Sequence, residues 1–391
     1  MTGLRDIIHI ARAPQTGVWS VIRQLSIWQR SKGHRVGIGL LIPSSWPKAA
    51  RDQLEDLRSN GIHIITASSP DIFGTGALLY HQLKNPISSW LDNFANVQSE
   101  TIIHFHNAWL AGAYLPLRTV KPSSAVVTYH GIAGASALRT QPIRRLIHRY
   151  WAQRLNAAGV KHASVDAENP KIAKELFDIE TDIFTVVANG YCAIPGASSS
   201  PPWLQDQSRT FTVGQVSVID DGKGWQITAM AVKYLRNNGH NVRLLLAGTG
   251  PQAQKAADWC HAHSSFAKYL GYVENPQIDV YPQLDVLALP SLTEGLPMAA
   301  IEALAFSIPV VATPVGGLAQ AITNGANGYL VGRTVSSIST SIRKMISDPA
   351  GYGRLSKGAR ESHRRYYSVD VMGRAYDELY DATTVLAGKR H

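Results

Sequence analysis

The sequence is poor in cysteine and in long hydrophobic runs. Cys192 and Cys260 are the two cysteines of a 391-residue chain, which excludes a disulfide framework and a cysteine-rich zinc site. This usage fits a reducing compartment. The opening MTGLRDIIHIARAP has an apolar core too short for a signal peptide, and no segment reaches the roughly eighteen apolar residues of a membrane span. We therefore expect a cytoplasmic protein.

Acidic residues are absent from one long stretch of a chain whose net charge is +10, the interval between Glu100 and Asp166. Within that interval the segment QPIRRLIHRYWAQRL, residues 141–155, carries apolar residues at helical spacing, flanked by basic ones. One interpretation is peripheral contact with an anionic membrane that carries a lipid-linked acceptor; the other is a core-facing helix with a solvated basic face. Nucleic acid binding is not expected, because the aromatic residues lie on the apolar face and no recognised binding motif is present. The apolar positions are Ile143, Leu146, Ile147, Tyr150, Trp151 and Leu155, and the flanking ones are Arg144, Arg145, His148 and Arg149.

Short apolar runs alternate with helix-length segments throughout, which predicts parallel sheets built from βαβ units. The expected strands of the first half are Ile7–Ala11, Arg35–Leu40, Ile62–Thr66, Thr101–Phe105, Ala125–Tyr129, His162–Val165 and Phe184–Val187. Those of the second half are Phe211–Val216, Val242–Ala247, Tyr269–Val273, Val286–Leu289, Pro309–Ala312 and Gly328–Val331.

The stretch ANGYCAIPGASSSPPW, residues 188–203, is rich in glycine, serine and proline and marks a predicted join. We predict an α/β protein of two doubly wound domains, residues 1–195 and 205–367, with a terminal helix at about 370–391 that returns to the first domain. Ligands of such sheets bind beyond the carboxyl ends of the strands. The active site is therefore expected in a cleft between two facing domains.

The stretch SLTEGLPMAAIE follows a predicted strand and opens a predicted helix. Pro297 suits the first turn of that helix, which should continue through Met298–Phe306. Backbone amides around Gly295 and Leu296 then lie at the positive end of the helix dipole, where a diphosphate would bind.

Two glutamates flank that turn. Glu294 precedes the helix, and Glu302 lies about 7.5 Å along it from Pro297. Carboxylates at these places can accept hydrogen bonds from the hydroxyls of a ribose and a sugar. Two glutamates at this spacing also occur on ordinary solvated helices, so the spacing alone leaves both interpretations open.

The segment EGLPMAAIEALAFSIPVVATPVGGLAQAITNGANGYLV resembles the signature region of family-4 glycosyltransferases, which are retaining enzymes of the GT-B fold. That family carries two glutamates separated by seven residues, then Gly-x-Pro-Val-Val-Ala-Thr, a Gly-Gly loop and Asn-Gly. The matching residues here are Glu294 and Glu302, Ser307–Thr313, Gly316 with Gly317, and Asn327 with Gly328. Ser307 stands where the family has glycine.

The resemblance implies two Rossmann-like domains facing each other across a cleft, the first binding the acceptor and the second binding a nucleotide-diphosphate sugar. It places Glu302 on the ribose and Glu294 on the donor sugar, with Lys223 and the amides of Gly295 and Leu296 on the diphosphate. Gln215 occupies the position of the family's arginine, and Cys192 replaces an acidic residue after the interdomain Asn189-Gly190. Bacterial exopolysaccharide or lipopolysaccharide synthesis is the implied setting.

The remaining donor and acceptor contacts come from loops that match the family less closely. Gly17, preceded by Thr16, stands in the first glycine loop, and Gly248 stands in the turn of LLLAGTGPQ. His106 and His130 follow successive predicted strands and are expected near the donor sugar and the acceptor. A buried, hydrogen-bonded histidine is the alternative for each.

The implied reaction is a front-face displacement in which the departing phosphate receives the acceptor's proton. His130, Glu294 and Lys223 are then the catalytic residues, and neither a metal nor a cofactor is expected. Two rival functions remain. The substitutions at Gln215 and Cys192 favour a non-catalytic nucleotide-sugar binder or inactive partner subunit, and Gly248-Thr-Gly250 is a weak fingerprint of an NAD-dependent oxidoreductase.

Overall fold

The protein is represented by a computed structural model, which describes residues 4–12, 17–43, 49–69, 101–114, 124–132, 135–193 and 200–388. The chain divides into two compact units. The N-terminal unit comprises Met1–Gly190 with Val369–His391, and the C-terminal unit comprises Tyr191–Ser368. Thr16, part of the predicted join and the last residues of the predicted terminal helix lie outside the described residues.

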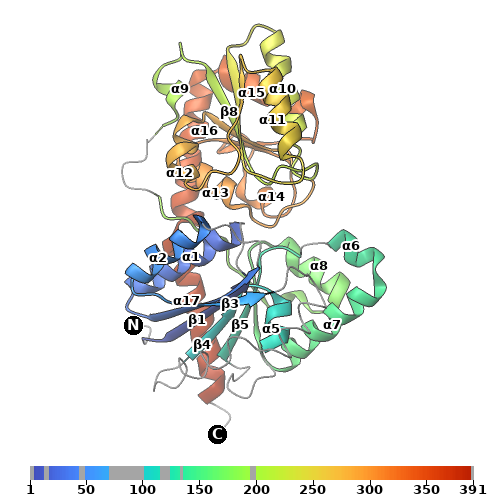
Figure 1. The fold of residues 1–391 in the computed structure, drawn as a ribbon, viewed down its shortest axis with the longest axis vertical. Coiled ribbons are helices and arrows are strands. Elements are labelled where there is room, and N and C mark those ends of the chain that lie inside the picture. The colour runs from blue at the N-terminus through green and yellow to red at the C-terminus, as the bar shows by residue number, and fades with distance from the viewer. Residues whose placement is uncertain are drawn as a thin grey trace. The chain divides into compact units, whose positions relative to one another are not determined.

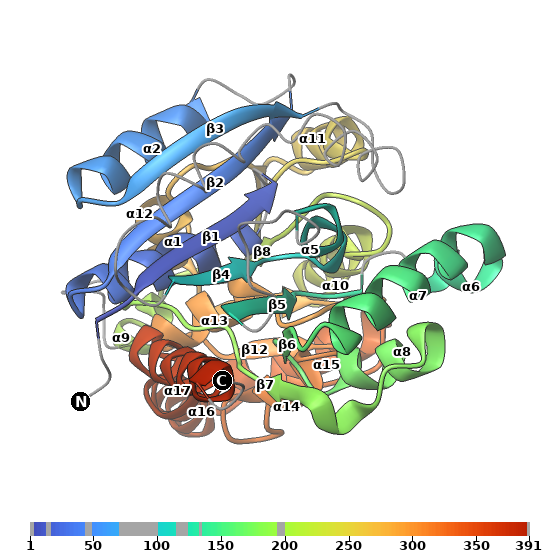
Figure 2. The ribbon, with the colours of Figure 1, turned by 90° about the horizontal axis from the view of Figure 1, so that it is seen from below.

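The N-terminal unit is built on a parallel sheet of seven strands in the order β3-β2-β1-β4-β5-β6-β7 (Figure 1; all seven strands are labelled in Figure 2). The chain winds outward from β1 in both directions, so the order reverses between β1 and β4, which is where doubly wound sheets bind ligands. The strands are β1 (Asp6–Arg12), β2 (Arg35–Pro43), β3 (His63–Ser69), β4 (Thr101–Phe105), β5 (Ala125–Tyr129), β6 (Lys161–Ser164) and β7 (Phe184–Val186).

Helices cover both faces of this sheet (Figure 2). Alternate side chains of a strand point to opposite faces. One set, including Val36, packs with α1 and α2, and the other, including Phe105, packs with α5 and α7. Helix α17 lies against α1, where Trp28 Nε1 donates to Asp370 Oδ1 at 2.8 Å. The helices are α1 (Gly17–Ser31), α2 (Ala49–Ser59), α5 (Ala108–Tyr114), α6 (Ala135–Thr140), α7 (Pro142–Ala157), α8 (Glu168–Phe177) and α17 (Val369–Gly388).

The C-terminal unit repeats this plan with a parallel sheet of six strands in the order β10-β9-β8-β11-β12-β13. Its order reverses between β8 and β11. The strands are β8 (Phe211–Val216), β9 (Val242–Ala247), β10 (Ala267–Tyr269), β11 (Val286–Leu289), β12 (Val310–Ala312) and β13 (Gly328–Leu330). The helices are α9 (Pro202–Gln205), α10 (Trp225–Asn237), α11 (Ala253–Ala262), α12 (Pro276–Asp279), α13 (Met298–Ala305), α14 (Leu318–Ala321), α15 (Val335–Ser347) and α16 (Pro349–Ser362).

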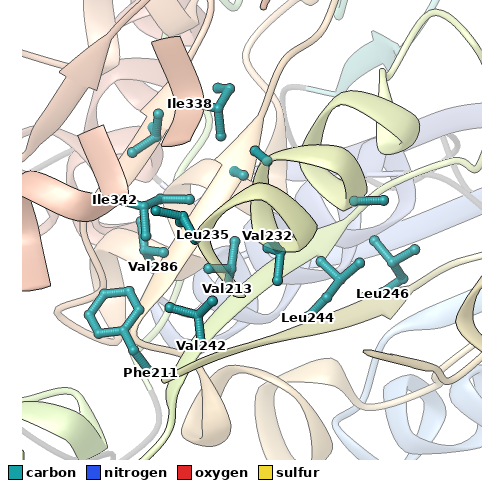
Figure 3. Packing of buried hydrophobic residues seen from close by; sticks show 14 of the residues in the cluster. Phe211, Val213, Val232, Leu235, Val242, Leu244, Leu246, Val286, Ile338 and Ile342 are labelled. Atoms are coloured by element: carbon teal, nitrogen blue, oxygen red, sulfur yellow. The ribbon is translucent and has the colours of Figure 1, made fainter. Parts of the chain in front are cut away.

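The main core of the C-terminal unit lies between its sheet and helices α10 and α15. Figure 3 shows Val232 and Leu235 of α10 and Ile338 and Ile342 of α15 directed toward strand residues such as Val213. All five are at most 1% exposed. Burying each such side chain contributes about 1.5–3 kcal/mol, so this core holds the carboxyl ends of β8 and β11 in fixed register.

The predicted α/β class with two parallel-sheet domains is confirmed. One strand was placed wrongly: Tyr269–Val273 was expected, whereas β10 spans Ala267–Tyr269. The chain turns away at Gly271, whose φ of +67° belongs to the left-handed region that glycine tolerates. Pro297 was expected inside the first turn of α13 but immediately precedes the helix, with ψ at 131°.

Candidate functional site

Two loops meet at the carboxyl end of the C-terminal sheet, where the strand order reverses. One follows β8 and leads to α10, and the other follows β11 and leads to α13. The backbone N–H of Leu292 in the second loop donates to the carbonyl of Gly222 in the first at 2.8 Å. Asp220 Oδ1 accepts from the Lys223 N–H at 2.8 Å, which fixes the turn that carries Lys223. Asp220 is thus used as a turn residue.

Lys223 and Glu294 form an ion pair across these loops. The Lys223 Nζ atom lies 2.7 Å from Glu294 Oε1, and the same oxygen accepts from Ser291 Oγ at 2.7 Å. The Glu294 side chain is 9% exposed, whereas Lys223 is 24% exposed. A carboxylate in this position is held in place by its partners, while the lysine keeps a surface on which an anionic ligand can bind.

Two glycines support the loop that begins with Glu294. The Gly317 N–H donates to the carbonyl of Gly295 at 2.7 Å. A Cβ on Gly316 would lie 2.0 Å from the carbonyl oxygen of Glu294, and one on Gly317 would lie 2.8 Å from that of Gly295. Gly316 also has φ at +50°. The backbone of the Glu294 loop therefore takes its path because the facing residues have no side chains.

Helix α13 carries the second glutamate of the motif. Glu302 is 9% exposed, and its Oε2 atom accepts from the Tyr281 hydroxyl at 2.6 Å. Burial, followed by the charge of Glu302, raises the pKa of Tyr281, so this hydroxyl stays protonated and remains a donor. Leu296 is buried ahead of the helix. The helix ends before Ser307, whose φ of +63° explains why the related motif has glycine there.

Gln215, at the end of β8, uses its amide within its own unit. Its Nε2 atom donates to Ser217 Oγ at 3.2 Å and to the Lys223 carbonyl at 3.0 Å, and its Oε1 accepts from Thr228 Oγ1 at 2.6 Å. The side chain is fully buried. Gln215 therefore holds the backbone of the Lys223 turn by a hydrogen bond and supplies no charge.

The turn at Gly248 also packs tightly against the loop after β8. A Cβ on Gly248 would lie 1.8 Å from the carbonyl oxygen of Ser217, and one on Gly250 would lie 2.6 Å from that of Ile219. The Ile219 N–H donates to the Thr249 carbonyl at 3.0 Å. These contacts account for both glycines without a dinucleotide, which removes the observation that favoured an NAD-dependent enzyme.

The acceptor-side residues predicted from the sequence lie in the N-terminal unit. His106 and His130 are brought together, with His106 Nδ1 at 2.9 Å from His130 Nε2. His106 is buried and His130 is half-buried. Gly17 is the exposed first residue of α1.

Sequence reasoning missed the partners of these two histidines. His9 interrupts an apolar strand, and that interruption was the available signal. His9 Nδ1 lies 2.9 Å from His106 Nε2, and His9 Nε2 lies 2.7 Å from Gln29 Oε1. Nitrogens of His9, His104 and His106 lie close enough together to hold a metal ion. Both nitrogens of each ring nevertheless have hydrogen-bond partners, which account for the cluster without an ion.

The predicted single apolar face of residues 141–155 is divided in the structure. Ile147 and Trp151 of α7 pack against the core, whereas Ile143, Leu146 and Tyr150 are 75%, 62% and 52% exposed. This second face carries arginines, among them one whose guanidinium stacks over Tyr150 at 5.7 Å. Among the helices that the structure describes, none has the length and apolar character needed to cross a membrane.

Comparison with known proteins finds a family match within the C-terminal unit. Residues 208–348 match the family model of glycosyl transferases group 1. The chain also superimposes on Anabaena Alr3699/HepE, solved with UDP and glucose, with a TM-score of 0.75 at 17% identity over 96% of this chain and 99% of that one. The chain therefore has the GT-B fold. WaaG, a glycosyltransferase involved in lipopolysaccharide biosynthesis, is a further GT-B neighbour, with a TM-score of 0.66 at 16% identity and coverage of 95% and 99%.

Curated relatives of this chain include the glycogen synthase of Mycobacterium tuberculosis, 27% identical over 55% of this chain and 51% of that protein. The D-inositol 3-phosphate glycosyltransferase of Rhodococcus jostii is 41% identical over 28% of this chain and 24% of that protein. The capsular polysaccharide biosynthesis glycosyltransferase CapM of Staphylococcus aureus is 25% identical over 44% and 46%. The match thus spans about half the length of the glycogen synthase and less of the other two.

Proposed function

We propose that this protein is a glycosyltransferase, which moves a sugar from a nucleotide-diphosphate donor to a hydroxyl of a glycan or lipid-linked acceptor with retention at the anomeric carbon. The observation that carries the proposal is the Lys223–Glu294 pair at the switch point of the unit that matches the family model. The partly exposed lysine and the tight backbone loop are suited to binding a diphosphate, and the buried carboxylate beside them is suited to binding a sugar hydroxyl.

The proposed roles follow from this placement. Lys223 and the backbone around Gly295 and Leu296 bind the diphosphate, Glu294 binds a hydroxyl of the donor sugar, and Glu302 binds the ribose. A carboxylate that already accepts from Tyr281 is held in one orientation for a second donor. These groups act by positioning and by stabilising charge.

In the proposed reaction the bond between the anomeric carbon and the phosphate oxygen breaks while a bond to the acceptor oxygen forms on the same face. The acceptor's proton passes to the departing phosphate oxygen. No enzymic base and no metal enter this scheme. His130 is proposed to contact the sugar, and the N-terminal unit to bind the acceptor. Bacterial exopolysaccharide or lipopolysaccharide synthesis is the proposed setting, supported by what CapM and WaaG are said to do.

A membrane role for α7 is part of the proposal. Ile143, Leu146 and Tyr150 recur at helical spacing on an exposed face flanked by arginines, which is suited to an anionic bilayer surface. We expect sedimentation with vesicles rich in phosphatidylglycerol and little with pure phosphatidylcholine. The double variant Ile143→Ser/Leu146→Ser should lose roughly ten-fold or more in vesicle affinity, because two buried apolar side chains are removed. Equal sedimentation of wild type and variant would contradict this role.

A second function is favoured by one specific observation. Gln215 is neutral and bound within its own unit, so the diphosphate site has one fixed cation fewer than the related motif implies. A nucleotide-sugar binder without transferase activity would tolerate this loss.

The deciding experiment incubates the purified chain with radiolabelled nucleotide-sugars and a bacterial membrane lipid extract. The enzyme proposal predicts transfer of label to lipid or glycan, with retained configuration of the new linkage by NMR. Binding of a nucleotide-sugar without hydrolysis or transfer supports the binder instead, and inversion of configuration contradicts the mechanism.

A further inference from the structure

Four histidines, a glutamine, a threonine and two tyrosines form a continuous hydrogen-bonded array in the N-terminal unit. Register places His9 of β1 beside His104 of β4. Strand alternation then puts His106 and His130, which follow β4 and β5, on the same face. Strand β5 and helices α1 and α17 supply the other members. The array lies at the switch point between β1 and β4. Its other members are Gln29, Thr128, Tyr376 and Tyr380.

The histidines of the array are neutral at physiological pH. Burial lowers the pKa of His9 and of His130 to about 4. Burial and the neighbouring histidines lower the pKa of His104 and His106 well below the usual range. Each neutral imidazole has one N–H and one lone pair, so each ring must donate at one nitrogen and accept at the other.

Gln29 sets the direction in which the histidine rings donate their hydrogen bonds. Its Oε1 atom lies 2.7 Å from His9 Nε2, so His9 donates there and presents a lone pair at Nδ1. His106 must then donate from Nε2 to His9 Nδ1 at 2.9 Å, and His130 must donate from Nε2 to His106 Nδ1 at 2.9 Å. The last lone pair is at Nδ1 of His130. That buried atom has no hydrogen-bond partner among the residues that the structure describes.

The hydrogen bonds in the other half of the array are donated in the same direction, from Gln29 toward Tyr376. The Gln29 Nε2 amide donates to the Tyr380 hydroxyl at 3.3 Å, and that hydroxyl can donate onward to His104 Nδ1 at 2.8 Å. His104 then donates from Nε2 to Thr128 Oγ1 at 2.7 Å, and Thr128 lies 3.0 Å from the Tyr376 hydroxyl. Reversing every proton would instead leave an N–H at His130 Nδ1 without an acceptor, and a buried orphan N–H is rarer in folded proteins than an unused acceptor.

We infer that Gln29 is a positioning residue, which fixes the tautomer of His130 through His9 and His106 so that Nδ1 of His130 accepts, and never donates, a hydrogen bond. The ligand group that meets this atom is therefore a hydrogen-bond donor. Its identity as a sugar hydroxyl rests on the proposed function, whereas the tautomer does not. A hydroxyl qualifies, while an ether, a fluorine or a carbonyl in the same place is rejected. This selectivity originates in a residue that the ligand never touches.

Nitrogen-15 NMR of labelled full-length protein at pH 7.5 tests the tautomer without any substrate. Histidine signals are assigned with His→Gln variants, and the chemical shifts separate protonated from unprotonated ring nitrogens. Wild type should show His130 protonated at Nε2 alone. Gln29→Glu, which keeps an oxygen for His9, should retain that state, whereas Gln29→Met should shift His130 toward the other tautomer. Gln254→Met, an exposed change in the C-terminal unit, is the matched control and should alter nothing.

Several results would overturn the inference. These are a wild-type His130 protonated at Nδ1, an imidazolium at neutral pH, or an unchanged His130 signal in a folded Gln29→Met protein. One zinc ion per chain in the purified protein would do the same, because a metal would replace the ring protons.

Substrate analogues test the consequence for binding. For the nucleotide-sugar that the protein uses, one deoxy position should weaken binding at least ten-fold, and fluorine at the same position should not restore it, because fluorine cannot donate. Restoration by fluorine at every sensitive position would overturn the donor requirement. If no nucleotide-sugar binds at all, the proposed function fails, while the NMR result still decides the tautomer.

Discussion

Replacing Lys223 by alanine is expected to reduce transfer by roughly a hundredfold or more, because it removes a charged donor preorganised at the leaving group. The Nζ atom lies 2.7 Å from Glu294 Oε1, and 24% of the lysine side chain is exposed, so it is anchored on one side and open on the other. In the proposed mechanism negative charge grows on the diphosphate as the sugar leaves. Lys223 is the fixed side-chain cation proposed there, since Gln215 supplies none.

The same substitution should cost little stability. The pair is partly exposed at its lysine end, and ion pairs of that kind contribute about 1 kcal/mol or less. Glu294 keeps its bond from Ser291, so the loop should hold its shape. Its carboxylate would, however, face the diphosphate without a counter-charge. Lys223→Ala/Glu294→Gln should therefore bind nucleotide more tightly than Lys223→Ala alone.

The assay is kcat/KM for transfer with the donor found by screening, together with calorimetric nucleotide affinity and a melting temperature for each variant. Lys357→Ala is the matched control, because that lysine is 80% exposed on α16. The reasoning is refuted if folded Lys223→Ala keeps kcat/KM within five-fold of wild type, or if the double variant binds nucleotide no better than the single one.

Three further predictions test other parts of the structure. Glu302→Ala should lower transfer roughly a hundredfold through loss of ribose orientation; unchanged nucleotide affinity would contradict its role. Gly316→Ala should destabilise the protein by on the order of 3 kcal/mol in urea unfolding. Gly239→Ala, also at a left-handed position but with open space around its Cβ, should cost only about 1 kcal/mol. Equal losses would contradict the close contact of Gly316 with the Glu294 loop. Burial lowers the pKa of His9 and His162 to about 4, so between pH 6.5 and pH 4 these histidines bind protons in the unfolded chain and not in the folded one. The free energy of unfolding should therefore fall by roughly 3 kcal/mol for each histidine as the pH is lowered over this range. A rise in this free energy toward pH 5 would contradict the prediction.

The sequence predicted the sheets well because buried parallel strands are short apolar runs. Thr101–Phe105 and Phe211–Val216, for example, agree with the structure at both ends. The error at Tyr269–Val273 arose where Gly271, rather than hydrophobicity, sets the end of the strand. The exposed face of α7 was also hidden in the pattern, since helical spacing alone does not show which apolar residues find a partner.

The candidate site was predictable where its residues are neighbours in sequence. Glu294 and Glu302 belong to one loop and helix, so their order was enough. Lys223, from another loop, was expected beside them through the resemblance alone, whereas Tyr281, the partner of Glu302, needed the fold. The array around His9 joins three strands to α1 and α17, so the contacts among its members needed the fold.

Thermal shift across a panel of nucleotide-diphosphate sugars tests the central claim most directly, because a ligand that binds the native state raises its melting temperature. The account predicts that at least one of these compounds stabilises the wild type, and that Lys223→Ala and Glu302→Ala each abolish most of that stabilisation while Lys357→Ala retains it. A panel in which no compound raises the melting temperature, or in which all three variants respond like the wild type, would contradict the claim that the C-terminal unit binds a nucleotide-sugar at this loop.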